Sequence, residues 1–372
     1  MLFGRKNLIG IPATILLAFM ATGCSLMHDD LDPCAVKPDT HTSVKFKYDY
    51  NTRGEDLFAS QVGAVTLYIF DEEGRLVTTV ERANSVHGDA LKSPEFQIDF
   101  ESDVIQPEHT YTFYAVAHEH PGGYDALLSD AGAAFRRTQM VPGEHGIGDL
   151  ILSLERDANG LVNHEGKMLN HFWTTLEPFR LEVPEEKVPA EGDPQEEDHY
   201  LVATVPLMRV TNKVTVTFWQ SDFPGLIDPA HYDIWIEVPK GNGVLDITGK
   251  VLDDSAMRYE PYNVETVRTD TGSGEAASIR ADFGISRIML GQEMTLVVRN
   301  KNTGNVTRIP ELPEILAASN KGFADKNWSD QEYLDREYEY DIKFAFGDPI
   351  PKWVDVNVAI LSWTYRVQLV DL

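Results

Sequence analysis

Cysteine is scarce in this sequence, because its 372 residues include only Cys24 and Cys34. Two cysteines exclude a framework of several disulfides, and they are too few for a zinc or redox site built from thiolates. Basic residues are also few, since 32 Lys and Arg stand against 59 Asp and Glu, which gives a formal net charge of −27. This balance argues against binding of nucleic acid and against flat attachment to anionic lipid, both of which need basic patches. It suits an acidic body held off a membrane by a tether, and solubility alone is the equally simple interpretation.

Motifs that carry catalysis are absent from the sequence. It has no glycine-rich phosphate loop and no Gly-x-Ser-x-Gly elbow, and its Ser, His and Asp residues show no local spacing typical of a triad. The best candidate for a metal site is His118-Glu119-His120, because residues two apart on a strand share a face. Zinc needs a third ligand that no neighbour suggests, and a polar strand end before the turn Pro121-Gly122-Gly123 is the simpler interpretation. We therefore expect no catalytic residue, metal, cofactor or small-molecule substrate.

The first residues are typical of an export signal. Arg5 and Lys6 precede an uncharged, mostly apolar run, Leu8–Met20, which is too short for a membrane-spanning helix of about 20 residues. The run leads into Ala21-Thr22-Gly23-Cys24, which resembles the lipobox of bacterial lipoproteins, where the cysteine thiol receives a diacylglycerol and the chain is cut before it. Ala21 stands where that pattern usually has Leu. We expect lipidation of Cys24, and the alternative is an ordinary secretory signal in which Cys24 pairs with Cys34.

The organisation of the chain follows from its length and composition. Without the signal peptide, residues 1–23, the chain has 349 residues and a formal net charge of −29, because the lost segment carries two basic residues and no acidic one. This length favours two domains. Residues 24–43 include two prolines and predict an extended, lipidated tether. An acidic, proline-bearing stretch at 183–199 marks the expected boundary between a domain at 44–200 and one at 201–372, although it could instead be a loop within one domain.

Alternation of apolar and polar residues with period two dominates the rest of the chain, as it does in half-buried strands. Clear examples are 44–50, 65–69, 232–238 and 338–346. The turn Asp71-Glu72-Glu73-Gly74 predicts a hairpin after the second of these strands. Many short strands, frequent turns and few helical stretches predict an all-β protein built from two antiparallel β-sandwiches in tandem.

Five stretches of the mature chain stand out together: Asp30–Cys34, Val44–Tyr50, Val65–Gly74, Pro206–Val216 and Gln331–Ile342. In this order, and together with the lipobox, they resemble the anchor (FimB-like) subunits of type V pili, the protease-matured fimbriae of Gram-negative anaerobes. They are similar to the family's short acidic segment ending in cysteine, its first strand, a strand and turn, the opening of its second domain and a strongly marked segment near its end.

The resemblance implies two transthyretin-like β-sandwich domains without catalytic activity. It also implies a lipoprotein on the surface of the cell outer membrane, held by acyl chains such as palmitate on Cys24. There it would fix the base of the pilus and limit the length of the fibre. The implied partner is a pilus stalk subunit, joined by strand exchange, in which a strand of one subunit fills an apolar groove of its neighbour.

The terminal strand is our candidate for the donor in that exchange. Its apolar side chains fall on odd positions and no predicted element follows it, so it could leave its own sheet at low cost; these residues are Leu361, Trp363, Tyr365, Val367 and Leu369. The alternative is that it is simply the last strand of the second sandwich, because Trp363 and Tyr365 would be costly to expose in a free monomer.

Two other functions compete with the anchor. A surface lipoprotein could bind glycans through exposed aromatic residues such as Trp235, which lies on the polar side of its strand, opposite Ile234 and Ile236. A second packed face of that strand is the simpler interpretation of Trp235. A tip adhesin of the same pili is the other possibility, but adhesins travel outward on the fibre, which a permanent lipid on the protein would prevent.

Overall fold

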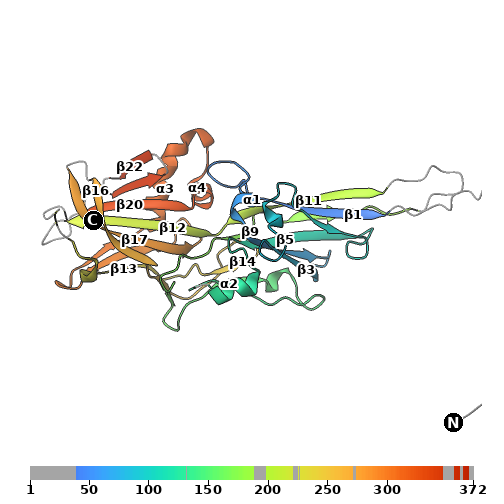
Figure 1. Cartoon of the computed structure of the whole chain (residues 1–372), viewed down its shortest axis with the longest axis horizontal. Helices are drawn as coiled ribbons and strands as arrows, with labels where there is room; N and C mark the ends of the chain where they lie inside the picture. The colour runs from blue at the N-terminus through green and yellow to red at the C-terminus, as the bar shows by residue number, and fades with distance from the viewer. Residues whose placement is uncertain are drawn as a thin grey trace, which may run out of the picture. The chain divides into compact units, whose positions relative to one another are not determined.

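The structure is a computed structural model that describes residues 39–130, 132–187, 198–220, 225, 227–270, 274–346, 356–360 and 363–367 (Figure 1). The expected signal peptide, Cys24 and most of the expected tether lie outside these residues. Residues 39–186 group with the chain from residue 198 onward into one compact unit. Within the described ranges, no helix is both long and apolar enough to cross a membrane.

The first sandwich consists of two layers joined by the long strand β11. In one layer β1 lies between β4, which is antiparallel to it, and β11, which is parallel to it. The facing layer has the order β3-β2-β5-β9, with β10 beside β5, and the end of β11 pairs with β9. The strands are β1 (Thr40–Lys47), β2 (Ala64–Phe70), β3 (Leu76–Ala83), β4 (Ile98–Phe100), β5 (Thr110–His118), β9 (Phe172–Thr175), β10 (Phe179–Glu182) and β11 (His199–Arg209).

The hairpin predicted after residue 69 is confirmed, since β2 and β3 pair antiparallel across the turn. Gly74 adopts a φ of +76°, which glycine accepts without strain, and the carboxylate of Asp71 accepts hydrogen bonds from the backbone N–H groups of Glu73 and Arg75. The half-buried character expected of β2 is wrong, because all seven of its residues are buried, including Thr66 and Tyr68 on the face predicted to be polar.

A third layer covers that second face of β2 and β5. It consists of the helix α2 (Tyr124–Asp130) and a small sheet of β6 (Phe135–Arg137), β7 (Ile151–Leu154) and β14 (Val244–Asp246). Phe135 is fully buried and packs within 5.4 Å of the ring of Phe172. The central strands of the first sandwich are therefore apolar on both faces, and simple alternation is lost where a further layer packs on them.

The second sandwich is formed by two larger sheets. One has the order β16-β17-β12-β20-β21-β22 and the other the order β19-β18-β13-β15-β8. The strands are β8 (Leu161–Val162), β12 (Thr211–Gln220), β13 (Tyr232–Val238), β15 (Met257–Tyr259), β16 (Asn263–Asp270), β17 (Glu275–Ser286), β18 (Thr295–Asn300), β19 (Val306–Ile309), β20 (Glu339–Phe346), β21 (Val356–Ile360) and β22 (Trp363–Val367).

Helices are few and short in the described chain. The α-helices besides α2 are α1 (Phe58–Gln61), α3 (Leu312–Ala317) and α4 (Asp330–Arg336), and the 3-10 helices are η1 (Ala90–Lys92), η2 (Ile147–Asp149), η3 (Pro229–His231) and η4 (Ala318–Lys326). The fold is thus all-β, with two β-sandwiches in tandem, as the sequence predicts. Most strand pairs are antiparallel, and the parallel exceptions in the described chain are β1 with β11, β12 with β20 and β15 with β8.

The change from one sandwich to the other takes place within a nearly continuous strand. β11 belongs to the first sandwich and β12 to the second, and only Val210 separates them. The domain boundary expected between residues 200 and 201 therefore falls inside β11. Each half also contributes one strand to a sheet of the other half. β8 of the first half pairs with β15, and β14 of the second half pairs with β7. One hydrophobic core accordingly runs through both halves.

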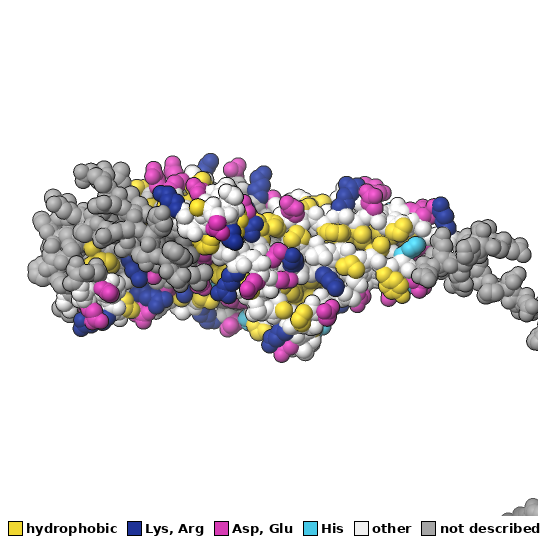
Figure 2. Space-filling view, turned by 90° about the horizontal axis from the view of Figure 1, so that it is seen from above, with side chains coloured by type: hydrophobic (Ala, Val, Ile, Leu, Met, Phe, Trp, Pro, Cys, Tyr) yellow, Lys and Arg dark blue, Asp and Glu magenta, His cyan; other side chains and the backbone are white. Residues whose placement is uncertain are grey.

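Charges of both signs are interspersed on the surface. Figure 2 shows Lys and Arg side chains lying among Asp and Glu on one face, rather than in a patch of their own. Local pairs explain this mixture, since Arg75 contacts both Asp71 and Glu73, and Lys92 contacts Asp89 at 2.9 Å. Such exposed pairs contribute little to stability, because water and salt screen them. Their main effect is to hold basic side chains close to carboxylates.

Candidate functional site

The His118-Glu119-His120 motif lies at the end of β5 and beyond it. His118 is 3% exposed, and neither of its ring nitrogens has a hydrogen-bond partner in the described part of the chain. Its ring lies 6.3 Å from that of His120, while Glu119 contacts Nδ1 of His171 at 2.8 Å. Within the described ranges, no three His, Cys, Asp or Glu side chains come together in a way that could hold a metal ion. The motif thus contributes one buried imidazole and one carboxylate in contact with His171, whose pKa burial lowers.

Buried imidazoles make the stability of the protein depend on pH. Burial lowers the pKa of His118 to about 3 and that of His164 to about 4, so both rings stay neutral in the folded chain. In the unfolded chain they take up protons below a pKa of about 6.5, and acid therefore favours unfolding. Between pH 7 and pH 5 each ring should remove about 2 kcal/mol from the free energy of unfolding. Urea titrations at both pH values would measure this loss, and His164→Gln should reduce it by about 2 kcal/mol. An unchanged pH dependence in that variant would contradict the assignment.

The candidate donor strand is described only in part. The backbone of β22, with Trp363, Tyr365 and Val367, pairs antiparallel with β21, and β21 pairs with β20. Leu361 and Leu369 lie outside the described residues. β22 is the last strand in the order of its sheet, so it pairs with β21 alone among the described strands. This position is compatible both with a strand that stays in its own sheet and with one that leaves it.

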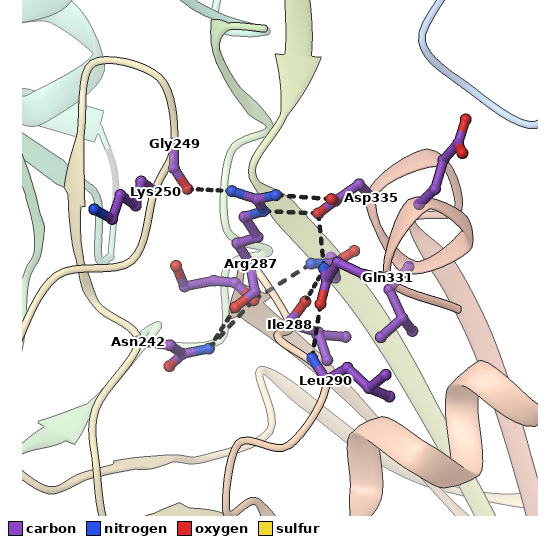
Figure 3. Close-up of polar contacts among 12 residues, drawn as sticks. Asn242, Gly249, Lys250, Arg287, Ile288, Leu290, Gln331 and Asp335 are labelled. Carbon is purple, nitrogen blue, oxygen red and sulfur yellow. Dashed lines mark hydrogen bonds and ion pairs between the residues drawn. The ribbon is translucent and has the colours of Figure 1, made fainter. Parts of the chain in front are cut away.

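The segment Gln331–Ile342, which carried part of the family resemblance, contributes contacts that join the two sandwiches. We call this region, with Arg287 and Arg209 as its other members, the joint. Its first contact is an ion pair between Asp335 on α4 and Arg287, which follows β17 (Figure 3). Arg287 donates to both carboxylate oxygens of Asp335, through Nε and Nη2, at 2.7 Å each. Both side chains are largely buried, with 14% and 6% of their surfaces exposed. This two-point geometry is among the stronger ionic contacts in proteins.

Further hydrogen bonds fix α4 to the loop after β17. The side-chain amide of Gln331 donates to the carbonyl of Ile288 at 3.1 Å and to Asp335 at 3.1 Å, and its oxygen accepts from the backbone N–H of Leu290 at 2.7 Å (Figure 3). From the other side, Asn242 donates to the carbonyl of Arg287 at 2.9 Å. The loop is therefore held by side chains from two directions.

Arg287 also connects this cluster to the first sandwich. Its Nη1 donates to the carbonyl of Gly249 at 2.7 Å. Gly249 has a φ of +74°, and a Cβ at this position would lie 2.7 Å from Oγ1 of Thr174 on β9. The backbone N–H of Thr175 donates to the carbonyl of Ile247 in the same turn at 3.2 Å. The turn is thus packed directly on β9, where only glycine allows the close approach.

A second set of contacts surrounds Arg209 at the end of β11. The ring of Tyr338 lies 4.0 Å from its guanidinium carbon, and Nε donates to the carbonyl of Thr211 at 3.0 Å. Arg209 is 4% exposed, and burial lowers the pKa of its guanidinium, which nevertheless stays charged because an arginine pKa lies far above neutral. The neighbouring residues Arg336 and Glu337 contact Tyr50 and Thr52 of the first sandwich, at 4.0 Å and 3.5 Å.

A cavity of about 500 Å³ opens beside Arg209, and polar side chains of both signs line it. Glu119 and His171 come from the first sandwich, whereas Glu337 and Glu339 come from the second. Glu337 is 2% exposed, and burial raises the pKa of its carboxyl. Its Oε1 accepts hydrogen bonds from the N–H groups of Tyr338 and Glu339, at 2.9 and 3.0 Å. These contacts fix the carboxylate against the backbone at the start of β20, and its Oε2 accepts from the hydroxyl of Thr52 of the first sandwich at 3.5 Å.

Trp235 is half-buried on the outer face of β13. Guanidinium carbons of Arg258 and Arg299 lie 5.0 and 5.9 Å from its ring, and its Nε1 donates to Glu237 at 2.8 Å. The two arginines have acidic partners of their own, Glu260 and Asp233. The ring is therefore already engaged by cations, and the simpler expectation of a packed second face describes it better than an open platform for sugars.

Sequence reasoning missed the joint, although it singled out the segment that forms it. The resemblance of Gln331–Ile342 to a family marked the segment as important, but it did not indicate which residues the segment contacts. Arg287 lies 48 residues before Asp335 along the chain, and Arg209 lies more than 100 residues before Tyr338. The pairing of β12 with both β17 and β20 brings these residues together.

Comparisons with known proteins give a family for the chain. A sequence model of the fimbrillin-A associated anchor proteins Mfa1 and Mfa2 matches residues 31–369. Among solved structures, a Bacteroides thetaiotaomicron protein described as a candidate polysaccharide-binding protein is 29% identical, with a TM-score of 0.67 over 88% of this chain and 98% of that one. A candidate adhesin from the same species is 25% identical, with a TM-score of 0.66 over 91% of this chain and 100% of that one.

The fold is also shared with a fimbrial anchor. The fimbrial anchor protein Mfa2 of Porphyromonas gingivalis is 19% identical, with a TM-score of 0.57 over 89% of this chain and 100% of that one. No curated protein matches the chain at a significant level.

Proposed function

The chain belongs to the family of fimbrillin-A associated anchor proteins, and we propose that it is the lipoprotein that fixes the base of a type V pilus to the cell outer membrane. The coarser role, a fimbrial anchor or adhesin of the cell envelope, follows from the family itself. The observation that carries the finer proposal is the family match over residues 31–369, which starts only seven residues after the cysteine of the lipobox-like segment.

Lipid on Cys24 supplies the attachment in this proposal. Two or three acyl chains hold a protein to a bilayer almost permanently, because each buried methylene contributes about 0.8 kcal/mol. β1 begins at Thr40, 16 residues after Cys24. An extended chain of that length reaches at most about 55 Å, so the first sandwich could stand well clear of the lipid surface. The acidic net charge is consistent with a body that does not lie flat on an anionic membrane.

Strand exchange supplies the junction with the stalk subunit. The candidate donor is the terminal strand, with Leu361, Trp363, Tyr365, Val367 and Leu369 as its apolar positions. β22 lies at the edge of its sheet, where release breaks the pairing with β21 alone among the described strands. A basal subunit needs one such junction only, because its other end is held by lipid, and growth would therefore stop where it joins the fibre.

Two sandwiches divide these tasks between them. We assign the first, expected at 44–200 and extended here to Arg209 by the pairing of β11, to the membrane side, and the second to the stalk side. A tip adhesin would need the same fold without a permanent anchor, so the two roles differ in whether the mature protein stays in the membrane fraction. A glycan-binding role is the weaker alternative, since the ring of Trp235 is engaged by Arg258 and Arg299.

Complementation of a deletion strain tests the anchor and the donor separately. Without the gene, pili should be shed into the medium and be longer than normal, whereas the full-length gene should restore short, attached pili. A variant that lacks residues 360–372 should reach the envelope in normal amounts and still shed pili. Attached pili in the deletion strain would contradict the anchor role. Attached pili of normal length in the truncated strain would contradict only the choice of donor strand.

A further inference from the structure

One backbone segment passes through both sandwiches. β11 and β12 are separated only by Val210, which is fully buried and donates its N–H to the carbonyl of Phe172 at 2.9 Å. Figure 1 shows the two strands following each other end to end, with β1 beside the first and β20 beside the second. Covalent bonds therefore join the centre of one sandwich to the centre of the other.

The strand that leads to the N-terminus is attached to this segment in parallel. β1 pairs with β11 from Thr40 opposite His199 to Lys47 opposite Pro206. Tension from the N-terminal side acts on the start of β1, and resistance from the second sandwich acts on the end of β11. Because parallel strands start at the same end, these two forces act at opposite ends of the pair and load it in shear.

Side chains of β1 and of Tyr48, the residue that follows it, reinforce the pair. Val44, Phe46 and Tyr48 are 0%, 6% and 0% exposed, and the ring of Tyr48 packs against Trp173 with centroids 5.6 Å apart. Sliding of β1 along β11 would thus drag three large side chains through a close-packed core while it breaks the ladder.

The second sandwich repeats the arrangement. β12 pairs in parallel with β20, from Lys213 opposite Glu339 to Gln220 opposite Phe346. Tension from the C-terminal side acts on the end of β20 and is resisted at the start of β12, which again gives shear. By contrast, β21 and β22 form an antiparallel pair, whose strands are pulled apart from one end when the C-terminus is loaded.

We propose that the protein carries tension along its length through two parallel strand pairs in series, β1 with β11 and β12 with β20, joined by the continuous β11–β12 segment. In shear, the hydrogen bonds of a pair share the load and must break together, whereas unzipping breaks them one after another. The biological use of this path rests on the proposed anchor role, but its mechanical strength is a property of the isolated chain and is tested without pili.

Proline substitutions separate the load path from general stability. His199 donates to the carbonyl of Asp39 at 2.9 Å, and in a ladder these contacts recur at every second residue, so the N–H of Lys45 faces β11. Asn84 donates to the carbonyl of Gly63 at 2.9 Å, and by the same rule the N–H of Thr78 on β3 faces β2. Each proline therefore removes one hydrogen bond of a ladder. Lys45→Pro removes it from the β1–β11 pair, which carries the load, and Thr78→Pro removes it from the β2–β3 pair, which does not.

The experiment is single-molecule unfolding of the mature chain, with Cys24 and Cys34 changed to Ser and handles at its two ends. Lys45→Pro should raise the unfolding rate at a fixed force by about tenfold, which corresponds to about 1.4 kcal/mol of barrier, and Thr78→Pro should leave it unchanged. Equal effects of both variants, or none from Lys45→Pro, would overturn the proposal.

Pulling in a second direction keeps the test valid if Lys45→Pro does not fold. Glu101 follows β4, whose end lies beside the start of β1, since Thr42 pairs with Phe100. A handle on Glu101→Cys in place of the C-terminal one would unzip β1 from β4 instead of shearing it along β11. The chain should then unfold at a clearly lower force than in the end-to-end geometry. Equal forces in the two geometries would overturn the proposal.

Discussion

Asp335→Ala should lower the free energy of unfolding by about 3–5 kcal/mol, the loss found when one partner of a buried ion pair is removed. Arg287 would keep its position under α4 but lose both hydrogen bonds to the carboxylate, now 2.7 Å each. Gln331 would lose its bond to Asp335, at 3.1 Å, as well. Urea unfolding at pH 7, followed by tryptophan fluorescence, would measure the difference directly.

Two further variants show whether the cause is the unpaired charge. Asp325→Ala removes an exposed carboxylate from the preceding helix η4 and should change the free energy of unfolding by about 0.5 kcal/mol or less. The double variant Arg287→Met with Asp335→Leu removes both charges, and it should be more stable than Asp335→Ala alone. If the double variant is the less stable of the two, the hydrogen bond from Arg287 to the carbonyl of Gly249 matters more than the unpaired charge.

The fold could be predicted from the sequence as far as local pattern reaches. Alternation in 44–50 and 338–346 predicted β1 and β20, and the glycine of the turn at Gly74 predicted the hairpin between β2 and β3. Alternation could not show that Tyr68 would be buried, because the layer that covers it comes from residues far along the chain, such as Phe135 and Leu152. The residue pattern of a strand indicates which side chains share a face, but it does not show which other elements pack on that face.

The joint between the sandwiches lay beyond prediction for the same reason. A pair such as Arg287 and Asp335 has no local signature, since either residue alone would be taken for a solvated surface charge. The parallel pairing of β1 with β11 is equally invisible in sequence, because it joins strands about 160 residues apart. What sequence did supply was the segment Gln331–Ile342, whose likeness to a family marked it before its contacts were known.

Cys24→Ser should release the protein and its pili into the medium together. Serine has nearly the same size as cysteine but no thiol to receive the diacylglycerol, so the chain would lose the only attachment that the proposal gives it. We expect almost all of the protein in the culture supernatant, measured by immunoblot after the cells and membranes are sedimented. Cys34→Ser is the matched control, because it changes the other cysteine of the chain and should leave both protein and pili with the cells.

The released protein should be as stable as the wild type. β1 begins at Thr40, and the described contacts of both sandwiches start at Asp39, so a change at residue 24 removes no contact among them. Its urea unfolding curve should therefore match that of the wild-type chain solubilised in detergent. Pili that stay attached to the cells would mean that something other than lipid on Cys24 holds them. A destabilised released protein would mean that Cys24 serves the fold, as it would if it paired with Cys34.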